Sequence, residues 1–338
     1  MFKKQIPVFY LLVAAILGSI ISLVGIRYFV AGASSNGQNS NDNQQSAATE
    51  QYTISRLAGY KYIQPMYLAE PQNESQGFAG LKSGITDFID AAQKTGDLDQ
   101  ASVYLKKLNT NEWMDVHPEN TFEPGSLFKV VTLTTFLRMA ETNLSILDKE
   151  VAYVNTTEKP PMQTFNSKNV EPGKKYKIRE LLYYMTVYSD NHATMLLHKY
   201  MDVAVFTKIF SDLGLKRPDV HDIRYRLSVK DYSKFISVLY DGGYLTIQAS
   251  EFALAMLCES DFNLGITKEL PKTLSVAHKF GEAGRPDARE LHESAIIFLN
   301  EKPYLLTIMT KGRESVKLAE IISHISKMVY DHMIAQPV

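Results

Sequence analysis

Residues 123–129 read Glu-Pro-Gly-Ser-Leu-Phe-Lys, and this stretch decides how the rest of the chain is interpreted. Its proline and glycine interrupt the preceding chain, and apolar residues then recur at helical spacing over residues 130–140. The stretch therefore predicts the start of a helix. Ser126 and Lys129 stand three positions apart, so they share one face of that helix and their side chains can touch.

A serine and a lysine held together in this way can carry out nucleophilic chemistry. A serine hydroxyl is a poor nucleophile unless a base takes its proton, and an amine in a partly desolvated site can be that base. The helix N-terminus adds backbone N–H groups that favour negative charge nearby. Taken alone the pattern is weak, because a helix-start serine followed by a solvated lysine has the same spacing.

Composition limits the classes of protein to which the chain can belong. With 338 residues, 45% of them hydrophobic, the chain can bury a substantial core. The formal net charge of −1 comes without a block of like charge, which argues against a nucleic-acid partner. The single cysteine, Cys258, excludes an internal disulfide and is expected to be buried among apolar neighbours. The histidines show no metal-binding spacing, so neither a metal nor another cofactor is expected.

The N-terminus predicts a membrane segment. Residues 6–26 contain no charged residue and are enough to cross a bilayer as a helix. Lys3 and Lys4 precede this run, so the positive-inside tendency keeps the N-terminus in the cytoplasm and exports the rest. We therefore predict a transmembrane signal anchor over residues 1–30 and an extracytoplasmic domain. A cleaved signal peptide, with its site at residues 31–33, is the alternative.

The remaining chain divides by composition and pattern. Residues 31–51 are rich in Ser, Asn, Gln and Gly and predict a flexible linker. The folded domain is expected over residues 52–335. Its α/β part comprises residues 52–125 and 271–335, and residues 126–270 form a helical lobe.

Periodicity inside the folded domain predicts an α+β fold. A helix is expected first, then two strands, a long helical region, three strands and a final helix. The simplest packing joins all the strands in one five-stranded antiparallel sheet flanked by the N- and C-terminal helices, with a cleft beside the helical lobe. The expected ranges are 81–92 for the first helix, 102–105, 113–116, 275–280, 294–299 and 304–309 for the strands, and 316–329 for the last helix.

Two further motifs support the chemistry of Ser126. Ser189-Asp190-Asn191 follow a predicted helix, and Lys279-Phe280-Gly281 lie on a predicted strand. In this order the three motifs resemble those of the penicillin-binding protein and class A β-lactamase superfamily of serine hydrolases. The resemblance covers roughly residues 52–335 and implies a β-lactamase-like fold. A literal Lys-Thr-Gly at residues 94–96 precedes Ser126 and is interpreted as a helix end.

The resemblance implies catalytic roles for the motif residues. Ser126 would be the acylated nucleophile, attacking a β-lactam or a D-Ala-D-Ala peptide bond of a peptidoglycan stem peptide. Lys129 would be its base. Ser189 would relay a proton to the leaving nitrogen, and Lys279 would orient Ser189 and attract the substrate carboxylate.

It also implies a binding surface. Asn191 would bind both the substrate's amide side chain and Lys129. The oxyanion hole would be the backbone N–H of Ser126 and that of Glu282, which follows Gly281 on the strand. Asp190 is interpreted as structural, capping the next helix.

The first departure from the family pattern concerns deacylation. Class A β-lactamases carry a glutamate that activates the deacylating water, but this chain has no glutamate between Glu180 and Glu251. An aspartate could substitute for it. Without such a base the acyl-enzyme should persist and deacylation should be slow. The segment 211–227, where the base belongs, holds Asp212, Asp219 and Asp222.

The second departure is Phe280, which stands where the family has Thr or Ser. Carboxylate recognition could shift to a cation such as Arg285, Arg289 or His292, and Phe280 could instead stack on an apolar substrate group.

Three hypotheses follow for the function of the chain. It is a membrane-anchored serine acyl-transfer enzyme, a non-catalytic penicillin- or cell-wall-binding module that keeps the fold, or an exported helical scaffold with chance motifs.

Overall fold

The computed structural model describes residues 51–57, 59, 65–154, 163–165, 167–219 and 225–336. The predicted signal anchor at residues 1–30 and residues 31–50 of the predicted linker lie outside the described residues. Within the described ranges, no helix combines the length and the apolar character needed to cross a membrane.

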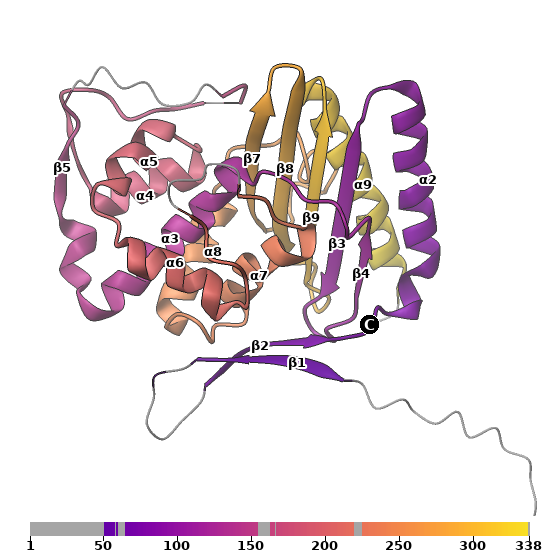
Figure 1. Cartoon of the computed structure of the whole chain (residues 1–338), viewed down its shortest axis with the longest axis horizontal. Coiled ribbons are helices and arrows are strands. Elements are labelled where there is room, and N and C mark those ends of the chain that lie inside the picture. The colour runs from indigo at the N-terminus through magenta and orange to yellow at the C-terminus, as the bar shows by residue number, and fades with distance from the viewer. Residues whose placement is uncertain are drawn as a thin grey trace, which may run out of the picture. The chain divides into compact units, whose positions relative to one another are not determined.

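The five central strands form one antiparallel sheet in the order β4-β3-β9-β8-β7 (Figure 1). The expected joining of the first two strands to the last three is therefore confirmed, and so is the α+β class. Val103 of β3 pairs with Val116 of β4 on one side and with Ile308 of β9 on the other. The strands are β3 (Gln100–Lys107), β4 (Trp113–Val116), β7 (Val276–Arg285), β8 (Ala288–Ile297) and β9 (Tyr304–Gly312).

Helices cover both faces of this sheet, which explains why its strands are apolar on both sides. On β9, Leu306 and Ile308 pack with the core of α2 (Ala79–Thr95) and α9 (Ser315–Ala335). The alternate residues Leu305 and Met309 pack with the core of the helical lobe. Helix α2 follows the short turn η1 (Gln76–Phe78) and ends at Gly96, whose left-handed φ of 80° closes the helix.

The helical lobe is built around α3 (Phe128–Thr142), which follows the 3₁₀ turn η2 (Gly125–Leu127). Buried residues surround α3, and its hydroxyls are satisfied within the helix: Thr134 and Thr135 donate to the carbonyl oxygens four residues earlier. The other elements of the lobe are η3 (Leu144–Asp148), α4 (Ile178–Val187), α5 (Asn191–His198), α6 (Val203–Asp212), α7 (Val229–Tyr240) and α8 (Ile247–Cys258).

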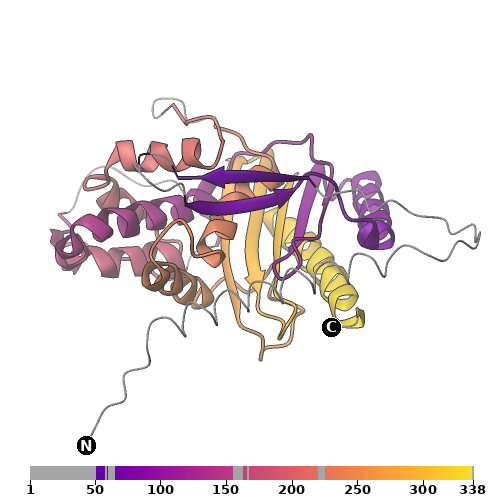
Figure 2. The same cartoon turned by 90° about the horizontal axis from the view of Figure 1, so that it is seen from below.

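Two small antiparallel pairs were not predicted from the sequence. One joins β1 (Tyr52–Arg56) to β2 (Met66–Pro71), and this ribbon crosses the sheet in the view of Figure 2. The indole of Trp113 anchors it by donating to the carbonyl oxygen of Pro71 at 2.9 Å. The other pair joins β5 (Glu150–Ala152) to β6 (Lys175–Lys177) within the helical lobe.

The expectation for Cys258 is wrong, because the cysteine is exposed. Helix α8 buries Ala253, Leu254 and Leu257, whereas Cys258 lies at its last position on the side that faces solvent. An apolar run in the sequence therefore did not indicate which side of the helix each residue takes.

Candidate active site

The turn that carries Ser126 lies directly against strand β7. Gly125 adopts a left-handed φ of 53°, and a Cβ atom on it would overlap the carbonyl oxygen of Glu282. A Cβ atom on Gly281 would lie 2.5 Å from the carbonyl oxygen of Pro124 and 2.8 Å from the backbone nitrogen of Leu127. Two glycines therefore allow the backbone of the edge strand to touch the backbone on either side of Ser126.

Lys129 joins the first motif to the second. Its side chain is buried, and Nζ donates to the carbonyl oxygen of Ser189 at 2.5 Å, to Ser189 Oγ at 3.2 Å and to Asn191 Oδ1 at 2.7 Å. None of these bonds goes to Ser126, which is half-buried on the turn just before α3. Three acceptors thus fix the amine one helical turn after the candidate nucleophile.

The surroundings of Lys129 make its amine a usable base. Burial lowers the pKa of Lys129 from 10.5 to about 7, although the charges of Asp190 and Glu282 act in the opposite direction. A substantial fraction of the amine is therefore unprotonated at neutral pH. A group whose pKa lies near the working pH is well suited to general-base catalysis.

Lys279 brings the third motif into the same site. It is fully buried, and its Nζ donates to the carbonyl oxygen of Phe280 at 3.1 Å. Burial and the positive charge of Lys129 lower the pKa of Lys279 well below its ordinary value. Lys279 thus lies close enough to be affected by the charge of Lys129, although their motifs are far apart in the sequence.

The second motif turns sharply between α4 and α5. Ser189 is fully buried with a left-handed φ of 55°, a conformation that is costly for a residue with a side chain. Asp190 then caps α5, because its carboxylate accepts from the backbone N–H of His192 and that of Val170, both at 2.8 Å. The structural role expected for Asp190 is confirmed. These bonds hold the strained turn that presents Ser189 to Lys129.

The sequence did not predict a connection across the site, which we call the bridge segment (residues 163–165). Gln163 Nε2 donates to the carbonyl oxygen of Ser189 at 2.9 Å and to Ser189 Oγ at 3.4 Å. The carboxylate of Glu282 accepts from the backbone N–H of Thr164 and that of Phe165 at 3.1 Å. The bridge segment therefore links the helical lobe to β7. No signal in the sequence marked Gln163, and Glu282 was expected to contribute only its backbone.

Phe280 packs within the protein core. The amine of the preceding residue packs against its ring, with Lys279 Nζ 4.2 Å from the ring centroid. The Phe280 ring is 2% exposed and stacks on Phe262 with centroids 4.2 Å apart. A cavity of about 250 Å³ lies beside this stack, between the bridge segment and Tyr188 of the helical lobe.

The three candidate cations have different surroundings. His292 is fully buried, and its Nε2 lies 3.1 Å from the carbonyl oxygen of Glu123. Arg285 is 80% exposed in its side chain and lies near Asp287. Arg289 reaches the bridge segment, where its Nη1 lies 3.4 Å from Thr164 Oγ1. Of the three, Arg289 is the one that contacts a segment bonded to the motif residues.

The three aspartates considered as deacylating bases differ in their surroundings. Asp212 accepts from the hydroxyl of Tyr244 at 2.8 Å and from Lys208 Nζ at 2.5 Å, so it is engaged within the helical lobe. Asp219 is exposed and lines a separate cavity of about 310 Å³ with Lys216 and Arg217. Asp222 lies outside the described residues.

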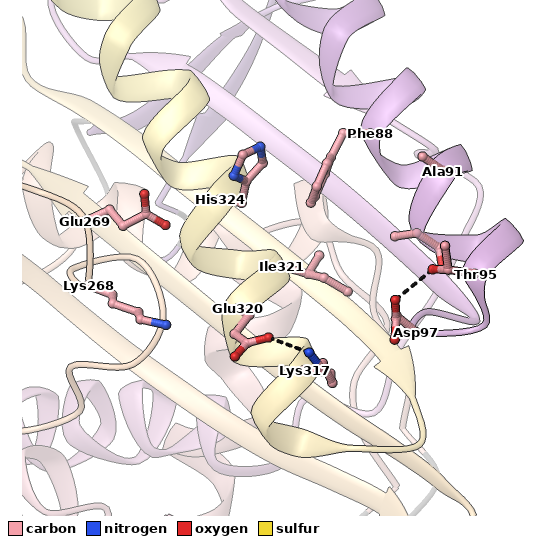
Figure 3. A pocket seen from close by; sticks show the side chains of 11 residues that line it. Phe88, Ala91, Thr95, Asp97, Lys268, Glu269, Lys317, Glu320, Ile321 and His324 are labelled. Carbon is pink, nitrogen blue, oxygen red and sulfur yellow. Dashed lines mark hydrogen bonds and ion pairs between the residues drawn. The ribbon is translucent and has the colours of Figure 1, made fainter.

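A cavity of about 450 Å³ lies on the opposite face of the sheet, between α2 and α9 (Figure 3). Phe88 and His324 pack against each other in it, with ring centroids 4.4 Å apart and ring planes inclined by 32°. Among its charged groups, Lys317 donates to Glu320 at 3.0 Å, and Glu269 accepts from the hydroxyl of Ser323 at 3.0 Å. No motif residue lines this cavity, so we do not assign the chemistry to it.

Comparisons with known proteins agree with this geometry. The family model described as the β-lactamase enzyme family matches residues 80–333. The solved structure of PBP-A has a TM-score of 0.65 and 17% identity, covering 78% of this chain and 99% of that chain. The structure of TLA-1 extended-spectrum β-lactamase has a TM-score of 0.65 and 18% identity, covering 77% of this chain and 100% of that chain. The structure of a β-lactamase from Chitinophaga pinensis has a TM-score of 0.65 and 16% identity, covering 75% of this chain and 98% of that chain. No curated protein sequence matches the chain.

Proposed function

The chain belongs to the β-lactamase enzyme family, and from this premise we propose that it is a serine acyl-transfer hydrolase acting through an acyl-enzyme on Ser126. The observation that carries the proposal is the position of Lys129. Its amine has a pKa of about 7, is bonded to Ser189 and Asn191, and lies one helical turn after Ser126. The positive charge of Lys129 in turn helps burial to lower the pKa of a second amine, that of Lys279.

In the proposed acylation step, the neutral amine of Lys129 takes the proton of Ser126 as Oγ attacks the substrate carbonyl. The backbone N–H groups of Ser126 and Glu282 stabilise the oxyanion, since the glycines on either side bring these two segments together. The bond between the carbonyl carbon and the nitrogen then breaks, as Ser189 gives its hydroxyl proton to the leaving nitrogen and receives the proton held by Lys129 across their 3.2 Å hydrogen bond. Lys279 supports Ser189 and attracts the substrate carboxylate. Asn191 binds the substrate amide.

We propose β-lactams or D-Ala-D-Ala peptides of peptidoglycan as substrates. A variant of PBP-A, which shares this fold, forms an acyl-enzyme complex with penicillin G. Deacylation is proposed to be slow, because no glutamate stands between Glu180 and Glu251 to activate water and Asp212 is engaged by Tyr244.

The direct test is covalent labelling of the folded domain by a fluorescent penicillin. Wild-type protein should be labelled, Ser126→Ala should not, and Ser145→Ala, at an exposed serine of the same lobe, should be labelled normally. A chromogenic cephalosporin should then give a burst followed by a slow steady rate. Fast steady turnover would contradict slow deacylation, and folded wild-type protein without label would favour the non-catalytic binding module.

We also propose that the domain stands outside the cytoplasm on the N-terminal anchor. The uncharged run at residues 6–26 and the lysines before it support this. The full chain should fractionate with membranes and be digested by protease added outside spheroplasts, whereas a chain without residues 1–30 should be soluble in the cytoplasm. A full chain recovered in the soluble fraction would contradict the anchor.

A further inference from the structure

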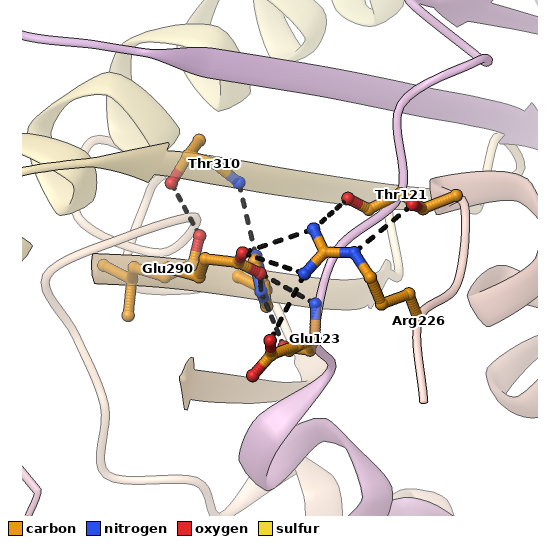
Figure 4. Close-up of polar contacts among 7 residues, drawn as sticks. Thr121, Glu123, Arg226, Glu290 and Thr310 are labelled. Carbon is orange, nitrogen blue, oxygen red and sulfur yellow. Dashed lines mark hydrogen bonds and ion pairs between the residues drawn. The ribbon is translucent and has the colours of Figure 1, made fainter. Parts of the chain in front are cut away.

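The backbone that leads into the Ser126 turn is held by two side chains of β8. Glu290 Oε2 accepts from the backbone N–H of Glu123 at 2.7 Å, and His292 Nε2 lies 3.1 Å from the carbonyl oxygen of the same residue (Figure 4). Both polar backbone groups of Glu123, three residues before Ser126, are therefore bonded to side chains of the sheet.

The surroundings of His292 define its tautomer. The backbone N–H of Thr310 donates to His292 Nδ1 at 3.3 Å, so Nδ1 is an acceptor and the proton lies on Nε2. The neutral ring then donates from Nε2 to the carbonyl oxygen of Glu123. The ring is fully buried, with Phe122 packed edge-on against it.

Arg226 completes the arrangement from the helical lobe. Its guanidinium lies 3.3 Å from Glu290 Oε1 and 3.4 Å from Glu123 Oε1, and it donates to the carbonyl oxygen of Thr121 (Figure 4). Glu290 is 4% exposed, and a buried carboxylate needs such a partner. The neighbouring backbone is paired as well, since Phe122 and Leu227 exchange two hydrogen bonds of 2.9 and 3.0 Å.

The Ser126 turn is thus restrained from two sides. Strand β7 lies against it through Gly281, which has no side chain of its own. Glu123, just before Pro124, is held by Glu290, His292 and Arg226. We call these three side chains the clamp. A displacement of about 1 Å at a reacting atom can cost roughly 10²-fold in rate. Ser126 Oγ is carried by a turn short enough for a shift at Glu123 to reach it.

We propose that Glu290, His292 and Arg226 are positioning residues, which set the location of Ser126 relative to Lys129 by fixing the backbone of Glu123. The inference rests on the proposed acyl-enzyme function. None of the three is placed in contact with substrate. Their effect should therefore fall on the rate of acylation rather than on the concentration of penicillin that half-saturates it.

The test measures acylation of purified folded protein by a fluorescent penicillin at increasing concentrations. Glu290→Leu and His292→Phe should lower the maximal acylation rate about 10- to 100-fold, with little change in the half-saturating concentration. Glu290→Gln keeps an acceptor for the N–H of Glu123 and should recover most of the rate. Ile325→Ala, a cavity variant in α9 on the far face of the sheet, should lose stability but keep the wild-type rate while folded.

Two further outcomes complete the test. If the buried variants do not fold, Arg226→Gln substitutes for them, because Arg226 is 34% exposed in its side chain and its loss leaves both β8 bonds in place; its rate should fall severalfold. Folded clamp variants that acylate at the wild-type rate would overturn this inference alone. Wild-type protein that is never labelled would overturn the proposed function instead.

Discussion

Gly281 and Pro124 approach so closely that a Cβ atom on Gly281 would lie 2.5 Å from the carbonyl oxygen of Pro124. Gly281 belongs to the edge strand of the sheet, and Pro124 directly precedes the turn of Ser126. The contact is made by backbone alone. Any side chain at position 281 must therefore separate the strand from the turn.

Gly281→Ala should accordingly lower both stability and acylation. The added methyl group overlaps backbone atoms on two sides, and overpacking of this kind costs about 1–3 kcal/mol. Gly80→Ala is the matched control: a Cβ there meets nothing within 4 Å, so the helix α2 should gain up to about 1 kcal/mol. Urea unfolding measures the free energy of unfolding of both variants. Equal stabilities would contradict the close contact between Gly281 and the turn.

Acylation should depend on pH through Lys129. Because burial lowers the pKa of Lys129 to about 7, the neutral amine that can accept the Ser126 proton increases as pH rises through that value. The labelling rate at low penicillin concentration should rise nearly tenfold per pH unit below about 7 and level off above it. A rate that stays flat from about pH 5.5 to about pH 8.5, roughly 1.5 units on either side of that pKa, would exclude Lys129 as the base.

Lys129→Met should separate catalysis from stability. Losing the base should reduce acylation by about 10²–10⁴-fold. The pKa of Lys129 is lowered on folding, so the unfolded chain binds more protons between about pH 7 and pH 10.5, and wild-type stability should rise with pH across that window. The stability of Lys129→Met relative to wild type should thus fall by roughly 1.4 kcal/mol per pH unit there. Denaturant curves at several pH values give this difference, and a difference independent of pH would mean that the amine stays charged.

Restoring the family's hydroxyl at position 280 should not improve the enzyme. The side chain of Phe280 is buried and stacks on Phe262, so Phe280→Thr leaves a cavity in the core. We expect a loss of about 3 kcal/mol in unfolding free energy and no gain in acylation. A faster acylation with β-lactams that carry a carboxylate would show that residue 280 does reach the substrate.

The sequence was sufficient to predict the sheet, because apolar periodicity and turn residues depend directly on which positions are buried. Strands β3, β4, β7, β8 and β9 and both flanking helices were predicted for that reason. The ribbon of β1 and β2 was missed since Tyr52–Arg56 is exposed along almost its whole length and has no apolar face to mark it. Local pattern carries no signal for a strand that contributes little to a core.

The site was predictable only in part. The motif residues could be named in advance, and the structure brings Lys129, Ser189 and Asn191 into contact. The roles of Gln163 and of the Glu282 carboxylate arise from contacts between distant segments, which spacing along the chain does not encode. The residue type of His292 suggested a cation that binds the substrate carboxylate. In the structure the ring is instead completely buried, and its Nε2 is bonded to the carbonyl oxygen of Glu123.

The pairing of β3 with β9 also has a consequence for biosynthesis. It aligns Gln100 with Lys311, so a strand made early must wait for one made near the end of translation. Its other neighbour, β4, offers only a hairpin, which is marginal in water. The nascent chain should therefore remain aggregation-prone until its last strands leave the ribosome, and assembly should be limited by this late, long-range closure.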